Sequence, residues 1–298
     1  MLLVCLKFTF WLVKKYSYFY TMIRFYNSLL FLLLVNFAMA QEIKVITYNI
    51  RLDVASDGLN QWGKRTESVK DLLKKSNPDV LCIQEGLFNQ MNDLQNMLPD
   101  YFYVGVGRDD GDKKGEFSAI FFRKNKFDLI SSNTFWLSPT PEISGSKGWD
   151  AAITRICSYG EVKLKDSGKS LFIFNTHFDH IGVKARKESS KLIIKKVADI
   201  AKDGAVILTG DFNSEPSTKA FKTIVKNKAH PLKDSYIKSD MRDCTFTGFE
   251  VLSGICKHID FIFYDNSFEQ KSYQIIIDNN GTYYPSDHLP VASVLLLK

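Results

Sequence analysis

Short apolar runs alternate with amphipathic segments from residue 41 to the end of the chain. The clearest amphipathic segment places Leu192, Ile193, Val197, Ile200 and Ala201 on one face at helical spacing. Such segments predict helices over residues 64–76, 89–98, 184–202 and 217–225. Runs rich in β-branched and aromatic residues predict strands over residues 43–50, 80–84, 101–106, 117–122, 127–135, 151–164, 171–177, 205–209, 258–264, 273–277 and 291–297.

Strand-rich runs occur in both halves of the chain, and helices punctuate each half. This order predicts an α/β (α+β) fold in which two β-sheets pack face to face with helices outside them. No segment rich in Pro, Ser and Gly interrupts residues 41–298, so we predict one domain over that range.

The first 40 residues have the composition of a leader. A short basic stretch after Met22 precedes an apolar run over residues 28–37, and Ala38 and Ala40 are small residues that a signal peptidase accepts. We predict translation from Met22, a signal peptide over residues 22–40 that is cleaved after Ala40, and a periplasmic or extracellular protein. The run is shorter than the roughly 20 residues that span a bilayer, so we expect no stable membrane insertion after cleavage. An uncleaved membrane anchor is the alternative.

Outside the leader the charge is nearly balanced. The chain has 39 Lys and Arg residues against 33 Asp and Glu residues, a formal charge of +6. Four basic residues and no acidic residue lie in the leader, which leaves +2 for residues 41–298. Binding to long duplexes depends on neutralising many phosphates with clustered basic residues, so this balance disfavours that class of protein.

Four of the five cysteines lie beyond the leader. Cys82 and Cys157 lie in apolar, strand-like runs and are expected to be core residues. Cys244 and Cys256 bracket a loop and could pair in an oxidising compartment, although we favour two free thiols there. No C-x-x-C pair indicates a zinc site.

Polar residues follow or interrupt the apolar strand runs in five places, which are 47–50, 82–85, 175–180, 208–213 and the split block 258–262 with 286–290. Loops at one end of a sheet converge into sites, so we expect these residues to meet. Asn49, Glu85 and Asp287 offer hard oxygen ligands, which suit Mg²⁺ or Mn²⁺ better than zinc.

A candidate general base lies in the last block. His288 could take a proton from water, with Asp260 orienting its ring. Asp260 interrupts an apolar run, where a carboxylate requires a partner that offsets its desolvation. Asp211 and Asn213 could hold the nucleophile or a phosphate oxygen, and a turn before a helix is the alternative.

Four of these blocks are diagnostic in combination. They are Thr-Tyr-Asn-Ile (47–50), Ile-Gln-Glu-Gly (83–86), Gly-Asp-Phe-Asn-Ser-Glu-Pro (210–216) and Ser-Asp-His-Leu-Pro-Val (286–291). In content and order they resemble the endonuclease/exonuclease/phosphatase superfamily over residues 43–297. That superfamily includes deoxyribonucleases, apurinic endonucleases, deadenylases, sphingomyelinases and inositol polyphosphate phosphatases. The resemblance implies a four-layer sandwich of two mixed β-sheets flanked by helices.

The resemblance also implies roles for individual residues. It implies Glu85 as the main metal ligand, with Asn49 and Asp287 nearby, and the His288–Asp260 pair as general base and orienter. It further implies that three residues face the substrate: Asp211 and Asn213 at the scissile phosphate, and His177 as a phosphate contact or acid.

This chain also departs from the pattern. Some members carry a second acid two residues after the equivalent of Asn49, where this chain has Arg51, which does not favour a two-metal scheme. The block His-Phe-Asp-His-Ile-Gly (177–182), followed by Ala-Arg (185–186), looks like an uncharacterised, largely bacterial branch. We expect Asp179 and His180 to shape the substrate pocket. Arg155 could contact a phosphate, and an ordinary surface charge is the alternative.

We predict an exported Mg²⁺- or Mn²⁺-dependent hydrolase of phosphate esters with phosphodiesterase or nuclease-like activity. The alternatives are a deadenylase-like 3′–5′ exoribonuclease, a sphingomyelinase or sugar or inositol phosphatase, and a non-catalytic ligand-binding protein on the same scaffold. A degenerate binder would be expected to have lost some of the acids. We expect a monomer whose substrate is a nucleic acid, a nucleotide, a phospholipid headgroup or a sugar phosphate.

Overall fold

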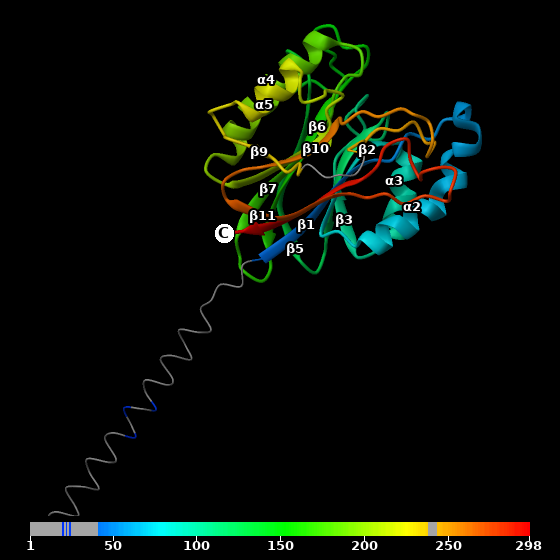
Figure 1. The fold of residues 1–298 in the computed structure, drawn as a ribbon. Coiled ribbons are helices and arrows are strands. Elements are labelled where there is room, and N and C mark those ends of the chain that lie inside the picture. The colour runs from blue at the N-terminus through cyan, green and yellow to red at the C-terminus, as the bar shows by residue number, and fades with distance from the viewer. Residues whose placement is uncertain (1–19, 21, 23, 25–40, 238–242) are drawn as a thin grey trace, which may run out of the picture. The chain divides into compact units, whose positions relative to one another are not determined.

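Two six-stranded sheets lie face to face, and helices cover the outer face of each sheet (Figure 1). The computed structural model describes residues 20, 22, 24, 41–237 and 243–298. Sheet A contains, in spatial order, β11 (Phe268–Ile275), β12 (Val291–Leu297), β1 (Gln41–Asn49), β2 (Val80–Gly86), β4 (Phe117–Arg123) and β3 (Tyr101–Val104). Sheet B contains β5 (Phe127–Trp136), β6 (Ile156–Leu164), β7 (Ser170–His177), β8 (Ala205–Asp211), β10 (Asp260–Tyr264) and β9 (Lys233–Asp234).

Each sheet mixes parallel and antiparallel pairs. Strand β1 pairs with β2 in parallel, and β7 pairs with β8 in parallel. The flanking pairs, such as β1 with β12 and β8 with β10, are antiparallel. The predicted α/β class with two packed mixed sheets and flanking helices is therefore confirmed.

The central strands are apolar on both faces because each sheet is covered on both sides. In β1, Ile43 and Val45 belong to the core between the sheets, while Ile46 and Tyr48 belong to the core under the helices of sheet A. Those helices are α2 (Trp62–Ser76) and α3 (Phe88–Met97). On the other side, α4 (Val183–Ala201) and α5 (Lys219–Val225) cover sheet B with apolar residues such as Ile193. The order helix, sheet, sheet, helix gives four layers.

Four elements differ from the sequence-based prediction. The strand expected from residue 151 begins at Ile156, because the backbone N–H groups of Ala152 and Ile153 bond to the carboxylate of Asp179 instead of a neighbouring strand. Strand β11 begins at Phe268, five residues earlier than expected, since its half-exposed polar residues hide the pattern of an edge strand. The short β9 and the 3₁₀ helix η1 (Ala55–Asn60) were not predicted.

Cys244 and Cys256 form a disulfide, so the expectation of two free thiols is wrong. Their Cα atoms lie 4.9 Å apart because Phe246 and Lys257 bridge in antiparallel register at the base of the loop. A polar loop gives no periodic signal for such a pairing. Cys82 and Cys157 are buried free thiols, as predicted.

The predicted signal peptide and its cleavage site lie outside the described residues, apart from three isolated positions. Residues 41–298 cluster as one compact unit. Within the described part of the chain, no helix is both long enough and apolar enough to cross a bilayer.

Candidate active site

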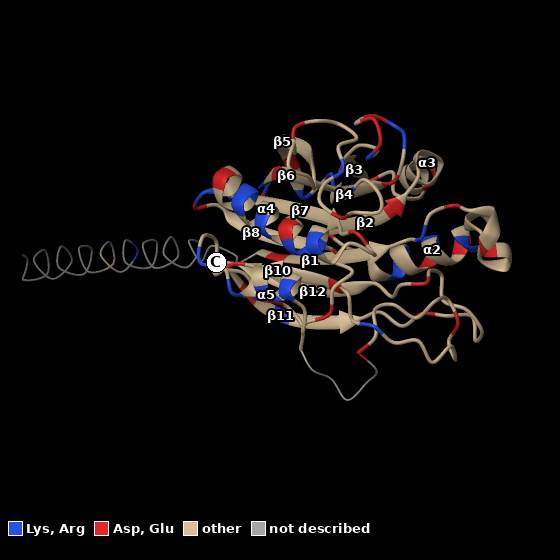
Figure 2. Cartoon of the chain, turned by 90° about the horizontal axis from the view of Figure 1, so that it is seen from above, with Lys and Arg blue, Asp and Glu red and all other residues tan. Residues whose placement is uncertain are grey.

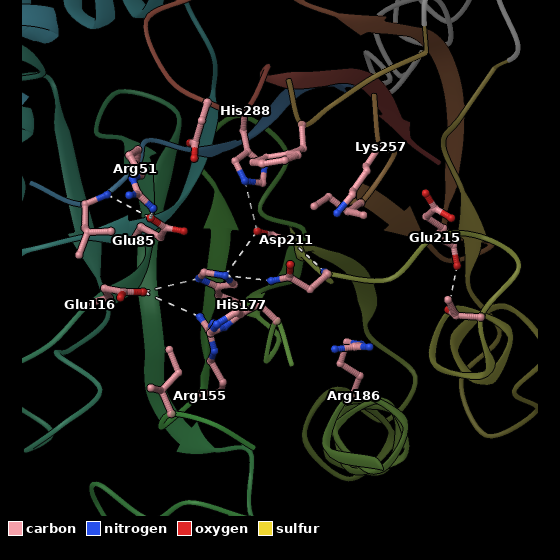
Figure 3. Close-up of a pocket in the computed structure, with 18 residues that line it drawn as sticks. Arg51, Glu85, Glu116, Arg155, His177, Arg186, Asp211, Glu215, Lys257 and His288 are labelled. Atoms are coloured by element: carbon pink, nitrogen blue, oxygen red, sulfur yellow. Dashed lines mark hydrogen bonds and ion pairs between the residues drawn. The ribbon is translucent and has the colours of Figure 1, made fainter. Parts of the chain in front are cut away.

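The predicted polar blocks meet at one end of the two sheets and line a cleft of about 740 Å³ (Figure 3). Strand register brings several of them together: Asp211 at the end of β8 lies opposite His177 of β7 and Asp260 of β10. Asn49 and Glu85 come from the ends of β1 and β2, which run parallel. The carboxyl ends of parallel strands thus supply the centre of the cleft, as the alternation of apolar runs and polar ends predicted.

His288 is held between two carboxylates at the centre. Its Nδ1 lies 2.9 Å from Oδ2 of Asp260, and its Nε2 lies 3.7 Å from Oδ2 of Asp211. All three side chains are buried. The ring of Phe246 packs edge-on against the His288 ring, with centroids 5.0 Å apart. The imidazole is therefore fixed in orientation, with Nε2 directed toward Asp211.

Burial and the neighbouring charges together set the pKa values of His288 and Asp211. Burial alone would lower the pKa of His288, but the carboxylates of Asp260, Asp211 and Asp287 outweigh it and raise that pKa to about 10. Burial, together with Asp260, raises the pKa of Asp211 to about 7, although His288 opposes the rise. The carboxylates therefore keep the His288 ring protonated at neutral pH, and Asp211 ionises less readily than an exposed Asp. A divalent cation nearby would oppose the same carboxylates and lower both pKa values.

Asn49, Glu85 and Asp287 form the candidate metal centre. The Nδ2 atom of Asn49 donates to Oε1 of Glu85 at 3.0 Å and to Oδ2 of Asp211 at 3.1 Å. The register of β2 is irregular between Ile83 and Gly86, and Glu85 has a φ of 64°, which re-aims its side chain. Left-handed φ values in non-glycine residues collect at functional sites.

The electrostatics of this centre fit a divalent cation. Burial and the neighbouring Glu85 carboxylate raise the pKa of Asp287, although His288 opposes this. Two buried carboxylates that repel each other are stabilised by a shared cation, and oxygen donors suit Mg²⁺ or Mn²⁺. The ligand atoms of Asp211, Asp260 and His288 also lie within 4.8 Å of one another and could hold an ion. We favour the Glu85 centre, because Asp260 and His288 are already bonded to each other.

His177 and Asn213 lie on the other side of Asp211. The Nδ2 atom of Asn213 bonds to the Phe178 carbonyl at 3.0 Å and lies 3.2 Å from Nε2 of His177. Because the amide nitrogen can only donate, His177 accepts at Nε2 and carries its proton on Nδ1. Burial and the nearby Arg155 and Arg108 keep the pKa of His177 well below its usual value. His177 is therefore neutral.

Arg155, His180 and Asp179 are placed differently from one another. Arg155 lines the cleft at 4% exposure, and its Nη2 lies 3.1 Å from Nδ1 of His180, which also lines the cleft. Two buried guanidinium atoms of Arg155, Nε and Nη1, lack a hydrogen-bond partner among the described residues. Arg155 is thus no ordinary surface charge. Asp179 does not itself line the cleft, so any part that it has in shaping the pocket is indirect.

The cleft is also lined by residues that were not predicted as site residues, among them four polar or aromatic residues, Glu116, Arg186, Lys257 and Phe246. Glu116 pairs with Arg108 at 2.5 Å and lies 3.8 Å from Arg155 and 3.7 Å from His177. Burial and Glu85 raise its pKa. Arg186 stood in a quoted block without a role, and the other three lie in segments whose sequence gives no sign of facing a cleft.

The profile of the Endonuclease/Exonuclease/phosphatase family matches residues 46–288. The chain belongs to this family. A family member of known structure from Bacteroides vulgatus is 38% identical, with a TM-score of 0.82, and the match covers 87% of this chain and 100% of that one. This agreement confirms the four-layer fold.

Two further relatives differ in how closely they match this chain. A mannosyl-6-phosphatase of Bacteroides thetaiotaomicron is 39% identical, with a TM-score of 0.79, over 86% of this chain and 100% of that protein. Nocturnin of Drosophila melanogaster is 23% identical in an alignment of 272 positions that covers 76% of this chain and 41% of nocturnin. This chain therefore spans less than half the length of that nocturnin. Family members are hydrolases of phosphate esters that generally use divalent metals.

Proposed function

We propose that this chain is an exported, divalent-metal-dependent phosphatase that hydrolyses a phosphate monoester of a sugar. The distribution of charge in the cleft carries this proposal. Glu85 of the candidate metal centre lies on one side of the cleft, next to Arg51, whereas Arg186 and Lys257 lie on the other side, and Arg155 lies beside Glu116 (Figure 3). A phosphate monoester carries close to two negative charges at neutral pH, so it is matched by a metal on one side and by cationic side chains on the other.

The relatives support a monoester substrate over the diester favoured from the sequence. The mannosyl-6-phosphatase matches along its whole length at 39% identity, whereas nocturnin matches over part of its length at 23%. The formal charge of +2 on residues 41–298 also gives little attraction for long nucleic acids. Nuclease-like hydrolysis of a diester remains the second candidate, because the same centre serves both reactions across the family.

We call the four residues at the centre of the site the central cluster; they are Glu85, Asp211, Asp260 and His288. The proposed chemistry uses these residues and their neighbours. Asp211 and His288 share the removal of a proton from the attacking water, and Asp260 keeps the His288 ring in the orientation that this requires. Asn213 and the neutral His177 contact the phosphate next to them. Arg155 stabilises the negative charge of the phosphoryl oxygens.

A cation held by Glu85, Asp287 and Asn49 would polarise a phosphoryl oxygen and offset the charge that develops during hydrolysis. Its charge would also reduce the repulsion among the buried acids. The role of the chain is to hold these ligands, exclude bulk water and keep the substrate phosphate between the two sides of the cleft.

Two features support export. The first 40 residues have the pattern of a signal peptide. The Cys244–Cys256 disulfide is a bond that persists mainly in oxidising compartments. The test is to express the full chain in a bacterium and determine the N-terminal sequence of the protein in each fraction. Export predicts Gln41 as the first residue outside the cytoplasm.

The activity is tested with purified protein, Mg²⁺ or Mn²⁺, and two kinds of substrate. Mannose 6-phosphate and 4-nitrophenyl phosphate are the monoesters, and bis(4-nitrophenyl) phosphate and a short RNA are the diesters. We expect metal-dependent release of phosphate from the monoesters, with a higher kcat/KM than for either diester. Faster hydrolysis of RNA would favour the nuclease, and inactivity toward every ester with both metals would exclude the proposal.

A further inference from the structure

Asp179 lies in the block 177–182, and its carboxylate accepts four backbone hydrogen bonds. Its Oδ1 accepts from the N–H groups of Ile181 at 3.0 Å and Gly182 at 2.6 Å. Its Oδ2 accepts from Ala152 at 3.0 Å and Ile153 at 3.2 Å. One side chain therefore joins the loop after β7 to the loop before β6. Burial opposes its ionisation, but these four bonds hold the pKa of Asp179 below its usual value.

Asp150 is a second carboxylate that joins the segment before β6 to the segment after β7. Asp150 accepts from the N–H groups of Lys184 at 3.1 Å and Ala185 at 2.5 Å, so a residue from another loop caps the first turn of α4. Gly182 allows this approach, since an added Cβ there would lie 2.6 Å from the Asp150 carbonyl oxygen and 2.7 Å from its carboxylate. Asp150 and Asp179 are called the clamp carboxylates below.

The clamp carboxylates hold three cleft residues in place, which we call the cationic wall: Arg155, His180 and Arg186. Arg155 follows the clamped residues 152–153, and His180 adjoins Asp179. Arg186 lies in the capped first turn of α4, and its Nη1 donates to the Asp179 carbonyl at 2.9 Å. Every member of the wall is thus within three residues of a clamped N–H group or of Asp179.

The free hydrogen-bonding groups of the wall are donors. A guanidinium can only donate, so Nδ1 of His180 accepts from Arg155, and a neutral His180 carries its proton on Nε2. Arg155 is nine-tenths buried or more, and its Nε and Nη1 have no hydrogen-bond partner among the described residues, although Nη1 lies 3.8 Å from Glu116 and Nε lies 3.9 Å from Asp179. Arg186 points into the cleft and, in the described part of the chain, has no carboxylate within 4.0 Å (Figure 3). Donors that lack a hydrogen-bond partner among the described residues, some buried on Arg155 and others reaching the cleft from the more exposed His180 and Arg186, fit an anion.

We propose that the clamp carboxylates are positioning residues for the cationic wall, and that the wall selects a doubly charged phosphate monoester over a singly charged diester. This inference rests on the proposed phosphoesterase activity and adds the selectivity of the same site. A diester offers one charge, which the metal side of the cleft satisfies, whereas a monoester offers a second charged oxygen to the wall. In this arrangement the block 177–182 builds the cationic wall, and Asp179 positions the wall without contacting the substrate.

The test compares a monoester and a diester with the same leaving group, 4-nitrophenyl phosphate and bis(4-nitrophenyl) phosphate, at a pH above about 7, where the monoester is a dianion. The variants are Asp179→Asn, Asp150→Asn and Arg186→Gln. The matched control is Asp199→Asn, an exposed carboxylate of the same helix that pairs with Lys195. Inorganic phosphate binding, measured by calorimetry and as competitive inhibition, reports on the wall without turnover.

We expect Asp179→Asn to raise the KM for the monoester and the Kd for phosphate by about 10-fold, the effect of losing one charge-assisted hydrogen bond. The KM for the diester should change less than about 2-fold, and kcat less than KM. Arg186→Gln should reproduce this pattern without disturbing the clamp, and Asp199→Asn should leave both substrates unchanged. Asp150→Asn and Arg186→Gln alter exposed or half-buried side chains, so they serve if Asp179→Asn does not fold.

Equal losses for monoester and diester, or a lower melting temperature with unchanged selectivity, would overturn the inference and leave the clamp with a structural role alone. If the wild type hydrolyses neither ester, the proposed function fails, but phosphate binding still decides the inference. In that case a wall that binds phosphate must lose affinity in Arg186→Gln, and unchanged affinity would exclude it.

Discussion

Nδ1 of His288 lies 2.9 Å from Oδ2 of Asp260, and Asp260 is 1% exposed. A carboxylate this deeply buried among apolar strand residues is stable as an anion only when a partner offsets its desolvation. The interaction with His288 therefore stabilises Asp260 inside the core of sheet B. It also fixes the His288 ring with Nε2 directed to the cleft.

His288→Ala should lower kcat at least ~100-fold, because the candidate general base is lost. Asp260→Asn should lower kcat by a smaller factor, since the ring remains but loses the carboxylate that orients it and raises its pKa. Steady-state kinetics measure both effects, and NMR titration of the imidazole should show a lower pKa for His288 in Asp260→Asn. An unchanged imidazole pKa would contradict the assignment of the pair.

Removal of the metal should abolish activity. Glu85, Asp287 and Asn49 are the proposed ligands, and loss of the cation removes several kcal/mol of charge stabilisation, more than ~100-fold in rate. Activity should vanish after dialysis against EDTA and return with Mg²⁺ or Mn²⁺. Glu85→Gln should weaken metal binding measured by calorimetry, whereas the exposed Glu67→Gln, on the surface of α2, should not. Full activity in EDTA would refute a metal-dependent mechanism.

The centre should bind one divalent ion per chain. Arg51 stands where some family members carry a second acid, and its guanidinium lies 3.9 Å from Glu85 and 2.9 Å from Asp57. This fixed positive charge supplies the neutralisation that a second cation would otherwise bring. Calorimetry and elemental analysis of the Mn²⁺-loaded protein should both give a stoichiometry of one. A value of two would show that Arg51 moves aside.

The central cluster was predictable because its residues break a strong local pattern. Asp260 interrupts an apolar run, and Glu85 ends one, so each signals a carboxylate with a buried partner. Asp179 was not predictable in the same way. Its sequence context indicates a loop, but whether its carboxylate faces a cleft or four backbone N–H groups depends on the loop before β6, which is distant in sequence.

The disulfide and the burial of Glu116 could not be predicted from the sequence, for a similar reason. Cys244 and Cys256 meet because Phe246 and Lys257 bridge, a pairing between loop residues that no periodicity encodes. Glu116 lies beside Gly115 at the start of β4 and looks like a turn residue, yet tertiary packing buries it against Arg108. Contacts between loops are set by the assembled sheets, and local pattern gives little information about them.

Reduction of the disulfide should lower both stability and activity. The loop that it closes contacts the active site: Thr245 accepts the N–H of Asp260, Phe246 packs on His288, and Thr247 donates to the Asp287 carbonyl. Cys244→Ser combined with Cys256→Ser should reduce the free energy of unfolding by about 2–4 kcal/mol, which chemical denaturation measures. It should also reduce kcat. Unchanged kcat in the double variant would mean that the loop keeps its contacts without the bond.

Asp234 in β9 should make the protein less stable as the pH rises. Burial raises the pKa of Asp234 to about 6, although backbone hydrogen bonds from Tyr236 and Ser235 oppose the rise. The folded chain therefore holds this proton more tightly than the unfolded chain does, so stability is lost between about pH 4 and pH 6 and the loss is complete at pH 7. Asp234→Asn removes the loss of stability that ionisation of Asp234 causes, so it should raise the free energy of unfolding at pH 7 by about 1–3 kcal/mol.

The same substitution should have no stabilising effect near pH 4, where Asp234 is protonated in the folded state. Denaturation curves at the two pH values separate this effect from a general gain in packing, which would stabilise at both. The exposed Asp199→Asn is the control for loss of one negative charge, since it changes the net charge equally without relieving a buried carboxylate. A gain at pH 7 that Asp199→Asn matches would assign the effect to net charge and exclude burial of Asp234 as its cause.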